Sequence, residues 1–131
     1  MLHATADIGT SNYTVSLVAG HHSLVSDERA AAGGQDAGPT PHELVCAALG
    51  ACTAITLRMY AQRKGWLLRA AHVDANLEWH DKKGVVARIL RFEGELNDDQ
   101  RARLADIAER TPVTLMLKQG LTITTTETPH P

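Results

Sequence analysis

The chain has 131 residues, a length typical of one domain and large enough to bury a core without disulfides. Charged residues make up 21% and the formal net charge is −2, so the composition favours neither a nucleic-acid surface nor an acidic tail. No uninterrupted apolar run reaches about 18 residues, and the first residues lead into alternating sequence without a signal-peptide pattern. We therefore expect one domain over residues 1–131, without a membrane span.

Three short strands are predicted in the first third of the chain. Apolar residues alternate with polar ones over residues 2–6 and 13–17 and recur at 24–25, and turn residues separate the three segments. Their spacing predicts an antiparallel meander. Residues 30–39, rich in Ala, Gly and Pro, are expected to form a loop.

A long helix is predicted from residue 41 to Lys64. Thr40 fits the N-cap, Glu43 the partner position of a capping box and Gly65 the C-terminal stop. Residues 44–57 carry no charge, so we expect this part of the helix to be buried on nearly all sides.

The second half predicts a hairpin, two helices and a strand. Residues 70–80 and 85–96 are expected to form the hairpin around a turn at 81–84. Asn97 and Gln100 predict a second capped helix, which should end near Arg110 before Pro112 interrupts it. A short helix at 113–118 and a strand at 121–126 follow. The order βββ-α-ββ-α-β indicates an α+β fold.

Both cysteines lie in the predicted long helix. Cys46 and Cys52 are six residues apart, which separates them by about 9 Å along the axis and about 240° around it. A disulfide between them is therefore disfavoured, and two free thiols suit a reducing cytoplasm. The seven histidines show no zinc-site spacing, and we expect neither a metal nor another cofactor.

Several separate motifs follow one another in the order and spacing of one known family. They are GQD (34–36), GPTP (38–41), EL (43–44), ALGACT (48–53), LRMYA (57–61), KGW (64–66), LADIAER (104–110) and PV (112–113). They resemble the OsmC/Ohr family over nearly the whole chain. The resemblance implies antiparallel sheets around a long buried central helix, and an intertwined homodimer with two sites at its interface.

The resemblance also implies an activity. In the peroxidase members, a cysteine at the place of Cys52 attacks organic hydroperoxides as a thiolate, which requires a thiol pKa below the free value of about 8.5. Cys52 is thus the expected nucleophile, with Arg29 and Glu43 as the candidates for the pair that steadies the thiolate. The substrate side of the site is expected to include His42, Leu49, Thr111 and Met116.

Two positions depart from the peroxidase members. There, a resolving cysteine precedes the proline of the second motif, whereas this chain has Thr111, whose hydroxyl cannot form a disulfide. The family's glutamate, ten residues before the reactive cysteine, is replaced by His42, with Glu43 one residue later. Arg29 is the only Lys or Arg before Arg58, although its position does not match the family arginine.

Helix geometry separates Glu43 from Cys52. Nine residues correspond to about 13 Å of rise and half a turn, so the two side chains of one helix cannot meet. If Glu43 or His42 assists Cys52, it must do so from another subunit. This agrees with the interfacial sites that the resemblance implies.

The sequence leaves two main functions open. One is a thiol-dependent peroxidase that reduces organic hydroperoxides in oxidative-stress protection. Its resolving thiol would be an external thiol, Cys46, or a thiol supplied by a partner enzyme. The other is a non-catalytic or redox-sensing protein that binds a small apolar ligand at the dimer interface, where Cys52 is a small buried hydrophobe. The retained Cys52 favours the first function, and Thr111 favours the second.

Overall fold

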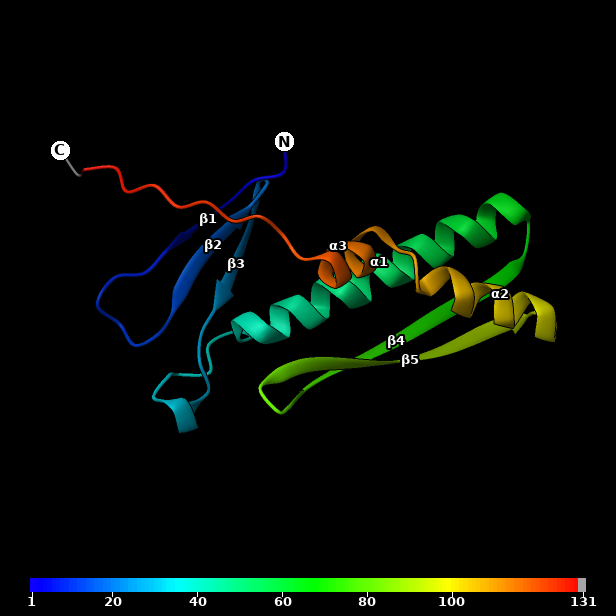
Figure 1. The fold of residues 1–131 in the computed structure, drawn as a ribbon, viewed down its shortest axis with the longest axis horizontal. Helices are drawn as coiled ribbons and strands as arrows, with labels where there is room; N and C mark the ends of the chain where they lie inside the picture. The colour runs from blue at the N-terminus through cyan, green and yellow to red at the C-terminus, as the bar shows by residue number, and fades with distance from the viewer. Residues whose placement is uncertain (130–131) are drawn as a thin grey trace. The chain divides into compact units, whose positions relative to one another are not determined.

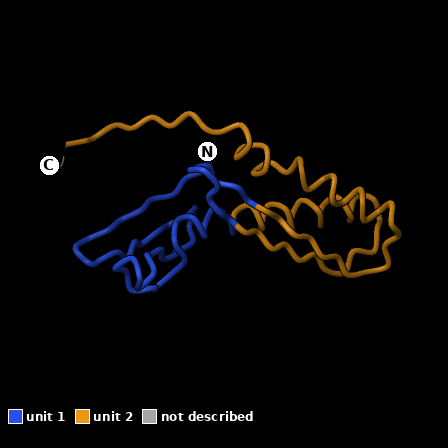
Figure 2. The backbone as a smooth tube through the Cα atoms, turned by 60° about the horizontal axis from the view of Figure 1, so that its bottom comes forward, with its two compact units in different colours: residues 1–47, 77–86 blue, residues 48–76, 87–131 orange. Residues whose placement is uncertain are grey.

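The structure, a computed structural model, describes residues 1–129. These residues form three α-helices, one short 3-10 helix and two antiparallel sheets. Figure 1 shows their arrangement along the chain. The chain divides into two compact units, Met1–Ala47 with Leu77–Val86 and Ala48–Asn76 with Ala87–Pro131 (Figure 2). We call them unit 1 and unit 2 and describe each separately.

Unit 1 contains a three-stranded meander. Strands β1 (Ala4–Asp7), β2 (Val15–Ala19) and β3 (His22–Ser26) pair antiparallel in the order β1-β2-β3. This confirms the three predicted strands and their arrangement. A short 3-10 helix, η1 (Ala30–Ala32), lies within the predicted loop.

Helix α1 (Pro41–Lys64) has the predicted bounds because both of its ends are specified locally. The Thr40 N–H donates to Glu43 Oε1 at 2.9 Å, and the Glu43 N–H donates to Thr40 Oγ1 at 3.2 Å, which forms the capping box. Gly65 ends the helix with a φ of +69°, a conformation that costs glycine little. The backbone bonds that close the last turn are those of a Schellman motif.

Within one chain, α1 buries a single stripe rather than nearly all sides. The buried residues recur every fourth position, at Leu49, Thr53, Leu57 and Ala61. Other uncharged residues stay exposed, among them Ile55 at 54% and Met59 at 55%. One chain supplies too few neighbouring elements to cover the remaining faces of so apolar a helix.

By its length and composition, α1 meets the criteria for a membrane-spanning helix. Over its most apolar 18-residue window the mean hydropathy is 1.6, so this helix of 24 residues is long and apolar enough to cross a bilayer. The expectation of no span rested on uninterrupted apolar runs, a stricter criterion. The core helix of a packed protein can have the same length and composition, and α1 contributes Leu57 and Ala61 to the core of unit 2.

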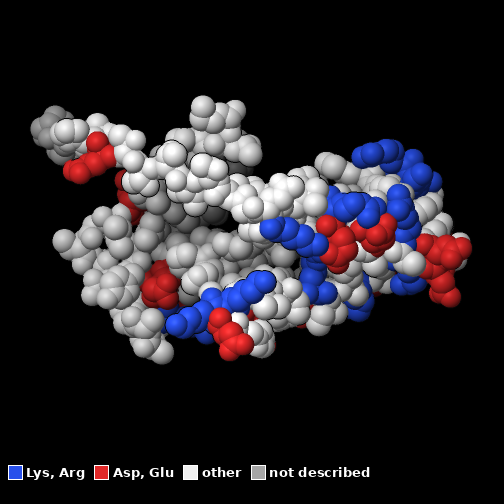
Figure 3. Space-filling model, in the orientation of Figure 1, with Lys and Arg blue, Asp and Glu red and all other residues white. Residues whose placement is uncertain are grey.

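The core of unit 2 joins α1 to a long hairpin and a second helix. The hairpin consists of β4 (Leu67–His80) and β5 (Lys83–Glu95), and the helix is α2 (Asp98–Ala108). The core side chains come from all three parts and are Leu57, Ala61, Leu68, Leu104 and Ala108. Mixed charges cover the part of unit 2 that carries α2 (Figure 3). Asp106 on α2 accepts hydrogen bonds from Arg103 and Arg110.

The predicted hairpin and the predicted cap of the second helix are confirmed, but the turn takes two residues rather than the predicted four. Asp81 and Lys82 have φ values of 50° and 68°, as a two-residue type I′ turn requires, and β5 resumes at the next residue. The side chains of Asn97 and Gln100 form the second capping box. The predicted short helix is α3 (Pro112–Gln119), and Thr111 is its N-cap.

The predicted strand at residues 121–126 is not formed. After α3, the described residues contain no strand, and Leu121 and Ile123 are 62% and 81% exposed. A strand needs a neighbouring strand to accept and donate its backbone hydrogen bonds. The β-forming composition of this segment finds no such neighbour within the described chain.

Two glycines of the motif before α1 are required by close backbone contacts. A Cβ at Gly34 would lie 2.1 Å from the Glu28 carbonyl oxygen, and one at Gly38 would lie 2.3 Å from that of Val25. We expect Gly34→Ala to lower the free energy of unfolding by about 1–3 kcal/mol through overpacking. Urea unfolding measures this, with Gly9→Ala as control because its Cβ would meet nothing within 4 Å. Equal stability of the two variants would contradict the prediction.

Candidate functional site

Cys52 lies in the middle of α1, at the edge of the buried stripe. Its thiol is free and half-buried, and so is that of Cys46, which confirms that the two cysteines do not pair. The next residue, Thr53, is fully buried. The Thr53 hydroxyl donates to the Leu49 carbonyl at 2.7 Å, so a side-chain bond closes the helical turn that carries Cys52.

A guanidinium from β5 reaches the turn that carries Cys52. Arg88 Nη1 donates to the hydroxyl oxygens of Thr53 and Thr114, at 2.9 Å each. The Arg88 side chain is 11% exposed, and its Nη2 lies 3.7 Å from a carboxylate oxygen of Glu109. Arg88 therefore bonds both α1 and α3.

Thr111 is fully buried and holds the start of α3. Its hydroxyl oxygen accepts the Thr114 N–H at 3.2 Å and lies 2.6 Å from the Thr114 hydroxyl oxygen. We call Thr53, Thr111 and Thr114 the threonine cluster. Its hydroxyl groups join Thr111, the residue before Pro112, to the turn of Cys52 through Arg88.

The other predicted substrate residues of unit 2 differ in exposure. Leu49 is 6% exposed, and its carbonyl is engaged by Thr53, whereas Met116 on α3 is 39% exposed. Thr111 exposes no surface within this chain. Of the predicted residues, Leu49, Cys52, Thr111 and Met116 belong to unit 2, and Arg29, His42 and Glu43 belong to unit 1.

The structure brings Arg29 and Glu43 together. Arg29 Nη2 lies 3.4 Å from Glu43 Oε2, and both side chains are more than half exposed. The pKa of the Glu43 carboxyl is lowered chiefly by the hydrogen bond from the Thr40 backbone N–H. The Thr40 hydroxyl and the charge of Arg29 lower it to a smaller extent. Glu43 thus serves both as the capping-box residue and as the partner of the candidate arginine.

His42 contacts an aromatic ring. Its ring centroid lies 4.9 Å from that of Trp79, and the two planes meet at 77°, an edge-to-face arrangement. Within residues 1–129, no group of three His, Cys, Asp or Glu side chains comes together in a way that could hold a metal ion.

Asp27 was not identified from the sequence. It is 1% exposed and accepts hydrogen bonds from the Thr14 hydroxyl and from four backbone N–H groups, those of Tyr13, Glu28, Gln35 and Ala37. These bonds fix the loop that carries Arg29. Burial raises the pKa of the Asp27 carboxyl. The hydrogen bonds from Glu28, Ala37, Tyr13 and Thr14 together lower it by more than burial raises it, so the pKa lies below 3.8.

Asp27 should make stability depend on acid pH. Because its pKa is lower in the folded chain, the stabilisation is complete above the unfolded pKa and is lost as the pH falls through the folded pKa. We expect Asp27→Asn to lower the melting temperature at pH 7, and this difference from wild type to shrink as the pH falls below 3.8. Thermal melts at several pH values test this, with Asp7→Asn on β1 as control. A difference that does not change with pH would contradict the carboxylate role.

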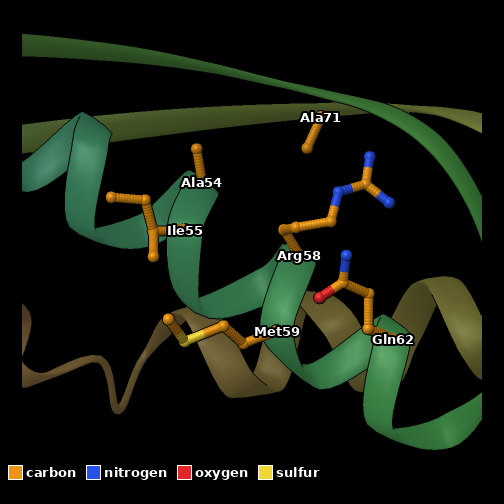
Figure 4. Close-up of a pocket in the computed structure, with 6 residues that line it drawn as sticks. All are labelled: Ala54, Ile55, Arg58, Met59, Gln62 and Ala71. Carbon is orange, nitrogen blue, oxygen red and sulfur yellow. The ribbon is translucent and has the colours of Figure 1, made fainter.

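A hollow of about 420 Å³ lies along α1 beyond Cys52 (Figure 4). Its lining combines apolar side chains with one guanidinium and one amide, from Ala54, Ile55, Arg58, Met59, Gln62 and Ala71. Arg58 is held in place because it donates to the carbonyls of Leu68 and Arg69 on β4. Such a lining suits a small, mostly apolar molecule.

Comparison with known proteins relates this arrangement to one family. The OsmC-like protein family model matches residues 33–126. No curated protein matches the chain.

Solved structures share the fold at low sequence identity. An OsmC-like protein from Mycoplasma pneumoniae superposes with a TM-score of 0.78 at 13% identity, covering 90% of this chain and 87% of that one. An organic hydroperoxide resistance protein from Legionella pneumophila gives 0.66 at 20% identity, covering 90% and 89%. The organic hydroperoxide resistance protein OhrB of Bacillus subtilis gives 0.61 at 19% identity, covering 90% of each chain. The family match and the common fold together show that this chain belongs to the OsmC-like protein family.

Proposed function

We propose that this protein is a thiol-dependent peroxidase that reduces organic hydroperoxides through Cys52 and takes its reducing equivalents from an external thiol. The observation that carries the proposal is the free, half-buried thiol of Cys52 in the central helix of an OsmC-like domain. Two structural neighbours named as organic hydroperoxide resistance proteins support it.

The chemistry needs one thiol of this chain and two from elsewhere. The Cys52 thiolate attacks the terminal peroxide oxygen, the O–O bond breaks, and the alkoxide takes a proton and leaves as an alcohol. Cys52 becomes a sulfenic acid. A first external thiol displaces water and forms a mixed disulfide, and a second external thiol releases Cys52 and leaves as the external disulfide. The Thr111 hydroxyl can replace neither external thiol.

The other predicted site residues act in this proposal across a homodimer. Glu43 cannot reach Cys52 along its own helix, so the Arg29–Glu43 pair of one copy serves the thiolate of the second copy. The 3.4 Å contact between Arg29 and Glu43 supports their joint role. His42, Leu49 and Met116 line the substrate side, and the reaction takes place in the cytoplasm.

Cys52→Ser tests the proposal directly. We expect the wild type to consume cumene hydroperoxide when dithiothreitol is present, Cys52→Ser to lose this activity, and Cys46→Ser to keep most of it. Alkylation by iodoacetamide should also be faster at Cys52 than at Cys46. If the wild type consumes no hydroperoxide and its Cys52 stays reduced under a stoichiometric amount, the peroxidase proposal fails.

The hollow along α1 favours a second candidate, the binding of a small apolar ligand without catalysis. Its apolar lining, with Arg58 at one side, suits an amphipathic anion. The fluorescent probe 8-anilinonaphthalene-1-sulfonate should then bind saturably and lose affinity in Met59→Lys. This result, together with a Cys52 that hydroperoxide leaves reduced, would favour binding over catalysis.

A further inference from the structure

We propose that Arg88 is the positioning residue of the Cys52 site, holding the helical turn that carries the thiol in register with the start of α3. The catalytic part of this inference rests on the proposed peroxidase function. The mechanical part, the link between α1 and α3, does not depend on it.

The hydrogen bonds of Arg88 restrict both helices at once. Its Nη1 donates to Thr53 Oγ1 and to Thr114 Oγ1, at 2.9 Å each. Each hydroxyl is also tied to its own surroundings, Thr53 to the Leu49 carbonyl at 2.7 Å and Thr114 to Thr111 at 2.6 Å. If α1 moves relative to α3, Arg88 Nη1 cannot keep its hydrogen bonds to both hydroxyls, so these bonds oppose the movement.

The burial of Arg88 indicates that its role is geometric. A guanidinium removed from water is costly unless it is well paired, and apolar replacements of buried ionic groups often stabilise proteins. The carboxylate nearest to Arg88, that of Glu109, is 60% exposed and stands 3.7 Å away, beyond hydrogen-bond distance. The partners that Arg88 does engage are neutral hydroxyls. Such hydrogen bonds fix the position of α1 relative to α3, whereas an apolar side chain in place of Arg88 could give equal or greater stability.

The position held by Arg88 bears on catalysis. Thr53 follows Cys52 directly, and Thr111 occupies the place of the second cysteine, so Arg88 connects the two positions that the reaction uses in the peroxidase members. Misplacement of a reacting group by about 1 Å costs roughly 100-fold in rate. We expect Arg88→Met to lower kcat for cumene hydroperoxide by about 10- to 100-fold with little change in KM. Arg88→Lys should restore part of kcat, since one ammonium can donate to both hydroxyls.

A matched arginine on the same strand provides the control. Arg91 is 67% exposed and has no bond to the threonine cluster, so Arg91→Met should leave kcat unchanged. If Arg88→Met folds and keeps the wild-type kcat, the positioning role is overturned. If Arg88→Met does not fold, Thr53→Val removes one of the two bonds and should lower kcat in the same direction. An unchanged kcat in a folded Thr53→Val would also overturn the role.

A readout independent of activity separates the two proposals. Hydrogen exchange of the first-turn amides of α3 should accelerate in Arg88→Met, or in Thr114→Val if Arg88→Met does not fold, but not in Arg91→Met. In urea unfolding, Arg88→Met combined with Thr114→Val should lose less stability than the two single variants added together. If the stability losses of Arg88→Met and Thr114→Val are coupled but the protein has no peroxidase activity, the link between α1 and α3 holds and the proposed function is rejected. Independent losses and unchanged exchange would overturn the link.

Discussion

Replacing Thr111 with cysteine should produce a disulfide between the introduced thiol and Cys52 when the protein is treated with cumene hydroperoxide. The family resemblance implies that the peroxidase members carry their resolving thiol at the residue before Pro112, and the change alters little volume. Loss of the N-cap bond to the Thr114 N–H should cost about 1 kcal/mol, so the variant should fold. The wild type, without this thiol, should instead lose Cys52 to over-oxidation when no external thiol is present.

Peptide mass spectrometry under non-reducing conditions measures both outcomes. Lys118→Cys is the matched control, because it places a thiol on the same helix at a side chain that is 60% exposed and should not trap Cys52. A folded Thr111→Cys variant that forms no disulfide, together with a wild-type Cys52 that stays reduced, would reject the peroxidase function in favour of ligand binding.

Sedimentation equilibrium at micromolar protein should give a mass of about twice the chain mass of 14.1 kDa. Within one chain, α1 leaves large apolar side chains exposed, including Ile55 at 54% and Met59 at 55%, and α3 leaves Leu115 and Met116 at about 40%. A second copy that covers α1 would remove this surface from water, which is the main driving force for association.

Ile55→Asp should therefore shift the mass toward that of the monomer, because it would bury a carboxylate in the interface. Arg63→Glu changes the charge in the last turn of the same helix and should leave the dimer intact. A monomeric wild type would contradict the dimer, and with it the site that combines residues of two copies.

Much of the fold could be predicted because its signals are local. The capping boxes at Thr40 and Asn97, the turn at residues 81–84 and the stop at Gly65 each depend on residues a few positions apart. The strand at 121–126 failed for the opposite reason. Its composition is β-forming, but strand formation depends on a neighbour that the sequence pattern cannot supply.

The candidate site was predicted less completely. Cys52 followed from the family resemblance, whereas Arg29 and Glu43 were chosen as the nearest candidates at positions that depart from the family pattern. Arg29 and Glu43 lie 3.4 Å apart, and their role toward Cys52 stays a prediction. Arg88 was missed because it lies 35 residues from Thr53 and 26 from Thr114, and an arginine on a strand normally faces solvent. Asp27 was missed because a loop aspartate gives no signal of the distant N–H groups that it binds.

The hydroxyl at residue 111 has a consequence for the kinetic order of the proposed reaction. Two-cysteine peroxidases close their oxidised state internally, at a rate that does not depend on any other molecule. A chain with a buried hydroxyl at this place must meet a second molecule after every oxidation. Resolution of its sulfenic acid is therefore bimolecular, and the fraction of Cys52 held as sulfenic acid at steady state depends on the ratio of hydroperoxide to thiol. The concentration of external thiol therefore sets the lifetime of the sulfenic acid in such a protein.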